Sequence, residues 1–234
     1  MTLWVYLGSN MENLGEFFIS IKDGLLYYLP GIGRPDRVLE FLGGHLMITL
    51  VTMLLAILIS VPLGILITRV RSLYDPIIRI AGMLYTVPSL AMFGMLIPIV
   101  GIGFTPAIVA LTLYSLLAII RNTAVGIDGV DSAIIEAARG MGMRDRSILL
   151  QVELPLALPV IFAGIRIATV STISLATLAS FFGASSLGSL IFEGLSAGRN
   201  DKIAAGAIGA AALAILFDFV IGQVERALPG SVAK

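Results

Sequence analysis

Residues able to do covalent or metal chemistry are nearly absent from this sequence. It has no cysteine and one histidine, His45, which excludes thiol nucleophiles, disulfide frameworks and multi-histidine metal sites. None of its lysines, Lys22, Lys202 and Lys234, stands in the glycine-rich loop that cradles nucleotide phosphates. We therefore expect no metal, no cofactor and no ATPase activity in this chain.

Two charged residues stand out because of their setting. Arg166 lies inside a long apolar stretch, and Asp218 lies at the end of another. A charge at membrane depth is by default a functional hypothesis, and a long side chain can also extend to the interface. We favour a structural ion pair between Arg166 and Asp218, placed within a membrane.

The segment 121–154 contains a polar motif that predicts two short helices. Asp131 can cap a short helix, and the small residues Ala137 and Ala138 allow another surface to approach closely. Gly140 and Gly142 can end this helix, and we expect Gly142 either to be left-handed or to face a partner closely. A second short helix is expected from about 145 to 153, and Pro155 then begins the next span.

The amino-acid composition indicates the class of protein to which these residues belong. Hydrophobic residues make up 58%, charged residues 13%, and the mean hydropathy is +1.01, against about 45–50% and about 25% in a soluble domain. This composition excludes a soluble enzyme and a disordered chain. The net charge of zero gives no basic footprint for nucleic acid.

Long uncharged stretches predict an all-α membrane protein with about five transmembrane helices. Residues 41–68, 80–120, 167–192 and 203–217 contain no Asp, Glu, Lys or Arg, and a spanning helix needs about 20 mostly apolar residues. Glycines 101 and 103 with Pro106 split the longest stretch. The predicted spans are therefore 45–68, 78–99, 104–120, 155–181 and 203–223.

The N-terminal segment differs from the spans because it is amphipathic. Apolar and charged residues occupy opposite helical faces over about 12–32, which favours a helix in the membrane surface over a sixth span with buried charges. The expected organisation is an N-terminal segment 1–41, a transmembrane domain 42–228 with the loop 121–154, and a tail 229–234.

The distribution of basic residues predicts the orientation. Most of the 15 Lys and Arg fall on the side that holds 69–79, 121–154 and 224–234, and positive residues stay in the cytoplasm. The N-terminus is then outside and the loop inside. His45 is expected at an outer interface, and Gly183 to Gly188 form an outer turn or line the mouth of a pathway.

The loop motif resembles the EAA loop of binding-protein-dependent ABC importer permeases. The matching positions are Glu136, Ala137, Ala138, Gly142, Val152, Leu154 and Pro155. The resemblance implies the type I ABC importer permease fold in the bacterial cytoplasmic (inner) membrane, in contact with membrane lipid. It implies as partners two ABC ATPase subunits that the EAA helix contacts, an extracytoplasmic substrate-binding protein, and a second permease copy or paralogue, with no nucleic acid.

Further segments resemble the osmoprotectant branch of that family, which carries glycine betaine, carnitine or choline. They are Val61–Gly64, Thr86–Ala91, Pro106–Leu111, Arg121–Thr123, Ala163–Arg166 and Ala176–Phe181. Quaternary ammonium ions are often held by aromatic cages, but Trp4, Tyr85, Tyr114 and Phe181 are scattered in the sequence. No substrate-binding residue is therefore assigned.

Three alternatives remain open from the sequence. A permease of the same family could carry another small solute, such as an amino-acid derivative. A secondary transporter would need more spans, inverted repeats or intramembrane acids, and Asp218 alone is weak support. A membrane enzyme would need clustered catalytic groups, which the spans lack.

The small residues Gly206, Ala207, Gly209, Ala210, Ala211 and Ala212 could pack helices between two chains or within one.

Overall fold

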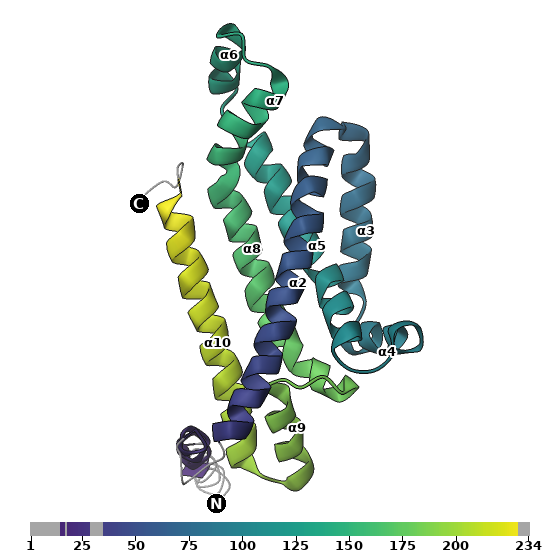
Figure 1. The fold of residues 1–234 in the computed structure, drawn as a ribbon, viewed down its shortest axis with the longest axis vertical. Helices are drawn as coiled ribbons and strands as arrows, with labels where there is room; N and C mark the ends of the chain where they lie inside the picture. The colour runs from purple at the N-terminus through teal and green to yellow at the C-terminus, as the bar shows by residue number, and fades with distance from the viewer. Residues whose placement is uncertain (1–14, 17, 29–34, 229–234) are drawn as a thin grey trace, which may run out of the picture.

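The computed structural model describes residues 15–16, 18–28 and 35–228, and this part of the chain is helical without a strand. The helices form an elongated bundle, with α6 and α7 projecting from one end (Figure 1). We call this the loop end, and the other the N-terminal end. The bundle helices are α2 (Pro35–Arg69), α3 (Tyr74–Thr86), α4 (Ser89–Val100), α5 (Phe104–Asp128), α8 (Leu154–Ala176), α9 (Gly188–Ala197) and α10 (Asn200–Ala227).

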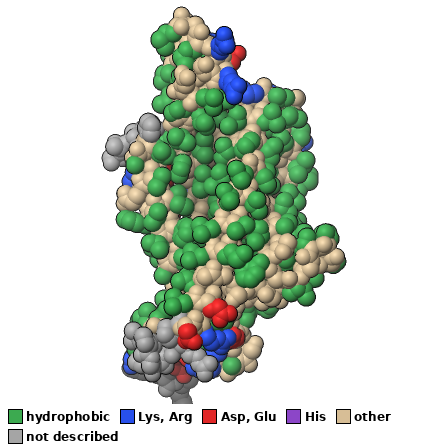
Figure 2. All heavy atoms as spheres, viewed as in Figure 1, with side chains coloured by type: hydrophobic (Ala, Val, Ile, Leu, Met, Phe, Trp, Pro, Cys, Tyr) green, Lys and Arg blue, Asp and Glu red, His purple; other side chains and the backbone are tan. Residues whose placement is uncertain are grey.

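Four helical stretches are long and apolar enough to cross a membrane, and a bent pair can form a fifth span. The four are Asp36–Arg69, Phe104–Asp128, Asp145–Phe182 and Asn200–Ala227. Hydrophobic side chains cover the middle of the visible face, while charged side chains gather towards its two ends (Figure 2). The all-α fold with about five spans is therefore confirmed.

The second predicted span, 78–99, is not one straight helix. The chain bends by 97° between Arg71–Thr86 and Ser89–Val100, so α4 points sideways at the edge of the bundle (Figure 1). Pro88 disfavours a helical conformation at the preceding residue, and Val87 is extended, with φ −64° and ψ 131°. Pro88 marks this break in the sequence, but hydropathy alone predicts one continuous span because the residues around it are apolar.

The third span also ends later than predicted. Helix α5 continues from residue 120 to Asp128, because leaving the apolar region does not end a helix whose residues can remain hydrogen-bonded along the backbone. The connecting loop therefore begins at 129 rather than 121. At the other end of the chain, α2 begins at Pro35, ten residues before the predicted span.

Close helix contacts build the centre of the bundle. A Cβ atom at Gly64 of α2 would lie 2.5 Å from Cβ of Thr123 in α5, and one at Gly164 of α8 would lie 2.5 Å from Cβ of Asn122. Glycine is thus required where α2 and α8 press against α5. Small residues at such contacts let backbones approach in apolar surroundings.

His45 is buried and does not lie at an exposed interface as predicted. Its side chain is fully inaccessible, and Nε2 lies 3.0 Å from the carbonyl oxygen of Ile173 in α8. A carbonyl only accepts, so Nε2 carries the proton in this contact. Helix α2 extends beyond the predicted start of the span, and this places His45 within the α2–α8 contact.

The N-terminal helix lies across the end of the bundle. Residues 18–26 are helical, and this helix is seen end-on beside the nearly vertical α2 and α10 (Figure 1). Tyr28 Oη donates to the carbonyl of Ala205, 2.7 Å away, and Tyr27 joins a core with Val38 and Leu190. Residues 29–34 between this helix and α2 fall outside the described part.

Candidate functional site

The loop at the loop end contains a short helix with well-defined ends. Helix α6 spans Ser132–Gly140, and Asp131 Oδ1 accepts a hydrogen bond from Ala133 N at 2.9 Å. At the other end Gly142 has φ +79°, so it takes the left-handed conformation that was one of its two expected roles. Met143 N donates to Ala138 O and Gly142 N to Arg139 O, the pair of bonds of a Schellman motif.

Helix α6 presents most of its motif residues to the outside. Ala138 is buried at 2% exposure, whereas Ile134 is 44% and Met141 77% exposed. Glu136 and Ala137 are also exposed. The structure therefore leaves one apolar face of α6 uncovered by this chain.

The second half of the loop is continuous with the following span. Helix α7 (Asp145–Ile148) leads through a π-helical turn, Leu149–Glu153, directly into α8. Pro155 has no N–H to donate to the carbonyl four residues earlier, which favours the wider π turn at this point. The separate helix predicted from 145 to 153 is thus the first part of one long helix, and Pro155 lies inside it. Val152 and Leu154 are partly buried along this segment.

An ion pair with a buried carboxylate joins the loop to the bundle, and sequence reasoning missed it. Glu153 is 4% exposed and accepts a hydrogen bond from Arg69 at the end of α2. Nearby, Arg71 Nη1 lies 2.7 Å from Asp128 Oδ2 at the end of α5. Glu153 directly precedes Leu154 and Pro155 of the loop motif, and this position could have singled it out. Its partner Arg69, however, lies 84 positions earlier in the sequence.

Comparison with known proteins identifies the chain as a transporter component. Residues 60–229 match the family described as "binding-protein-dependent transport system inner membrane component". The chain belongs to this family. It is accordingly a permease of an ABC importer and a multi-pass protein of the inner membrane, and the resemblance to this family is confirmed.

Relatives and a solved structure agree with this assignment. A carnitine transport permease of Listeria monocytogenes is 46% identical over 79% of this chain and 84% of its own. A choline transport system permease of Bacillus subtilis is 45% identical over 79% of this chain and 85% of its own. An osmoprotectant import permease of Salmonella typhimurium is 42% identical over 79% of this chain and 88% of its own. The MetNI methionine ABC transporter has a chain with a TM-score of 0.76 and 23% identity, over 84% of this chain and 98% of its own, which supports the fold.

Within the permease, Arg166 and Asp218 form the ion pair that their positions suggested. The guanidinium Nε and Nη2 donate to the two carboxylate oxygens, each at 2.6 Å, a bidentate geometry. Glu225 Oε2 lies 3.6 Å from Arg166 Nη1. The pair ties α10 to α8, and no described group of three or more His, Cys, Asp or Glu lies close enough to hold a metal.

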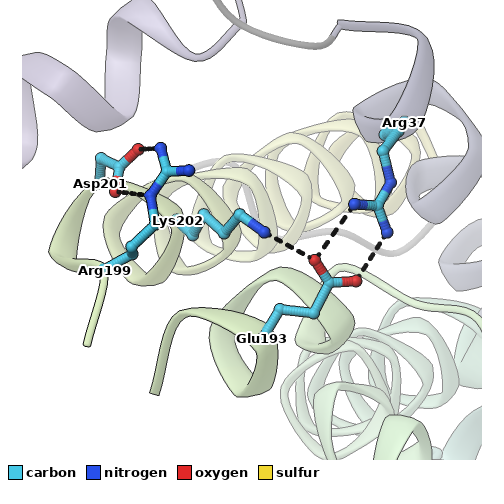
Figure 3. Close-up of polar contacts among 5 residues, drawn as sticks. All are labelled: Arg37, Glu193, Arg199, Asp201 and Lys202. Carbon is cyan, nitrogen blue, oxygen red and sulfur yellow. Dashed lines mark hydrogen bonds and ion pairs between the residues drawn. The ribbon is translucent and has the colours of Figure 1, made fainter. Parts of the chain in front are cut away.

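A second charge network fixes the N-terminal end of the permease. Glu193 of α9 accepts from Arg37 of α2 at 2.7 Å and from Lys202 of α10 at 2.9 Å (Figure 3). Arg199 and Asp201 form a neighbouring pair. Burial alone would raise the pKa of Glu193, but hydrogen bonds from Lys202 and Arg37 outweigh it and lower this pKa below its usual 4.5. The network joins three helices at one end.

The tyrosines that appeared scattered in the sequence are in contact. The rings of Tyr85 and Tyr114 are 6.0 Å apart and inclined at 73°. Phe181 instead packs against Phe192. In the turn from 183 to 188, Ser186 Oγ lies 2.7 Å from Ser180 Oγ and accepts from Gly188 N. Tyr85 and Tyr114 lie 29 positions apart, so only the packing of α3 on α5 reveals the pair.

Proposed function

We propose that this permease forms the membrane pathway for a small quaternary-amine osmoprotectant such as glycine betaine, carnitine or choline. The observation that carries the proposal is the similarity, at 42–46% identity over about four fifths of the chain, to permeases named for these solutes. A separate substrate-binding protein outside the membrane delivers the solute. A structure shared with a methionine transporter supports the fold alone.

Coupling to ATP is proposed to occur through α6. The uncovered apolar residues Ile134 and Met141 form a surface suited to a groove on an ABC ATPase subunit, with the charge of Glu136 beside them. Neither Arg144 nor Arg146 has a partner among the described residues, so both guanidinium groups are free to contact acidic residues of that subunit. Closure of the ATPase pair then moves the loop and α8 together.

The loop end is proposed to face the cytoplasm and the N-terminal end the exterior. Helix 18–26 then lies in the outward-facing surface of the inner membrane. It belongs to an N-terminal segment of about 1–41 that precedes the permease domain. Two copies of this chain, or one copy and a paralogue, complete the pathway. The exposed apolar face of α10, with Ile215 at 69% and Phe219 at 61% exposure, is available to lipid or to that second chain.

The test is reconstitution of the complete transporter in proteoliposomes with its ATPase and binding protein. Uptake of labelled glycine betaine, carnitine and choline is measured with and without ATP. ATP-dependent uptake of at least one of them is expected. Uptake of none, by a complex that hydrolyses ATP, would refute the assigned solute class.

A further inference from the structure

A small cavity lies in the bundle next to the bend between α3 and α4. Its volume is about 230 Å³, and its lining comes from Tyr85 and from faces of α5 and α8. Pockets for drug-sized ligands are larger, about 300–1,000 Å³. The cavity is therefore suited to a small solute, and its residues indicate which chemical class.

One part of the cavity is aromatic. Tyr114 is 7% exposed, and its hydroxyl donates to the carbonyl of Val87 at the bend, which fixes the ring. Tyr85 packs against it edge to face and is itself 51% exposed. No carboxylate is among the described lining residues. Aromatic faces attract cations, and quaternary ammonium groups in particular.

The other charged feature of the cavity is a guanidinium group. Arg121 lines the cavity and follows Tyr114 by seven residues on α5, two helical turns or about 10.5 Å along the axis on the same face. Within the described residues Arg121 makes no hydrogen bond or ion pair. Arg69, Arg71 and Arg166, by contrast, all have carboxylate partners.

Hydroxyl groups also line the cavity. Ser115 and Thr172 bond to each other at 3.0 Å, so their hydrogen-bonding capacity is partly used within the wall. Ser171 also lines the cavity and is exposed. The lining thus offers aromatic faces, a few hydroxyls and one unpaired cation, all on rigid helices.

We propose that this cavity is a transit site for a zwitterion with a quaternary ammonium group and a carboxylate. The ammonium lies against Tyr85 and Tyr114, and the carboxylate is bound by Arg121. Guanidinium binds carboxylate in a two-point geometry. This inference rests on the proposed function and narrows it, because glycine betaine and carnitine have both groups whereas choline has no carboxylate.

The experiment uses the complete transporter in proteoliposomes, with uptake of the three solutes and ATP hydrolysis without solute measured in parallel. Tyr85→Leu should lower uptake of every imported solute at least tenfold, and Tyr85→Phe should retain at least half. Arg121→Gln should lower uptake of the two zwitterions at least tenfold and of choline less than twofold, with partial recovery in Arg121→Lys. Arg79→Gln, on α3 outside the cavity, is the matched control and should change nothing.

The results separate the two proposals. A wild-type complex that hydrolyses ATP but imports none of the three solutes overturns the proposed function and this site with it. Import of choline alone overturns the zwitterion site only. If wild type imports a zwitterion, the site is refuted by normal uptake in Tyr85→Leu, by equal losses for zwitterion and choline in Arg121→Gln, or by equal losses in Arg121→Gln and Arg121→Lys. Solute-free ATP hydrolysis within twofold of wild type shows that each variant has assembled.

Discussion

Arg69, the last residue of α2, forms an ion pair with Glu153, the last residue of the π turn that leads into α8. Glu153 is buried, while the side chain of Arg69 is 43% exposed. Any displacement of the loop must therefore either carry α2 along or expose a buried carboxylate. The pair connects the loop mechanically to the first span.

Removal of the arginine should destabilise the permease more than removal of both charges. Arg69→Met leaves Glu153 buried without its partner, which costs about 3–5 kcal/mol for a fully buried pair and less here because Arg69 is partly exposed. Arg69→Met/Glu153→Leu removes the unpaired charge. Thermal unfolding of the detergent-purified proteins should give a lower Tm for the single variant than for the double. Equal Tm values for the two variants would show that leaving Glu153 without its partner costs no stability.

Gly142→Val should lower transport at least tenfold. A β-branched residue at φ +79° stores strain of about 1–3 kcal/mol, and about 1.4 kcal/mol of coupling corresponds to a tenfold change. Asn tolerates this conformation better, so Gly142→Asn should be milder, and so should Glu136→Ala, which keeps the helix. The measurement is solute uptake per amount of permease in the membrane.

Gly140→Ala is the matched control for that series. Gly140 lies two residues earlier in α6 with helical backbone, and open space surrounds both positions within this chain. Its substitution should leave transport near wild type. Full transport by Gly142→Val would mean that the loop is an ordinary connection.

Single cysteines in this cysteine-free chain test the orientation. Ser196 in α9 and Arg144 in the loop are both exposed, whereas the hydroxyl of Ser185 in the neighbouring turn is buried and makes a poor labelling position. In intact cells an impermeant thiol reagent should label Ser196→Cys and not Arg144→Cys. Labelling of the loop position from outside would reverse the orientation and remove the basis for ATPase docking.

The Glu193 network should make stability depend on pH in the acidic range. Because the folded-state pKa of Glu193 is lowered below 4.5, its ion pairs stabilise the fold above the unfolded pKa and are lost as pH falls through the folded value. Glu193→Gln should therefore lower the Tm at pH 7, and the difference from wild type should shrink below about pH 4.5. A difference that is constant down to pH 3 would contradict this mechanism.

The exposed face of α10 should meet a second permease chain or lipid. Ala207, Ala211 and Ala212 are exposed, while Gly206 packs within the chain, where a Cβ atom would lie 2.7 Å from the Leu187 carbonyl. Active complexes should contain two permease chains per ATPase pair, as counted by native mass spectrometry. An active complex with a single permease chain would rule out the pairing.

The sequence was sufficient for what depends on composition and local pattern. Charge-free stretches located the spans, and Asp131 with Gly142 located the two ends of α6, since a cap and a left-handed residue are local requirements. The ion pair of Arg166 and Asp218 was also accessible, because two charges in apolar surroundings have few other partners.

Contacts between distant segments could not be predicted in this way. The burial of His45, the partner of Glu153 and the meeting of Tyr85 with Tyr114 all depend on how helices pack, and hydropathy does not encode that. The bend at Pro88 was missed for another reason, because a uniformly apolar stretch reads as one span even when a proline interrupts it.

The bend of 97° after Thr86 also has an electrostatic consequence. The C-terminal end of a helix carries a partial negative charge equivalent to about half an elementary charge, because its peptide dipoles are aligned. Helix α3 ends beside Tyr85, so this partial charge lies next to the cavity. It requires no acidic side chain, and it does not titrate. Its contribution to the potential at the cavity is therefore the same at every pH at which the permease remains folded.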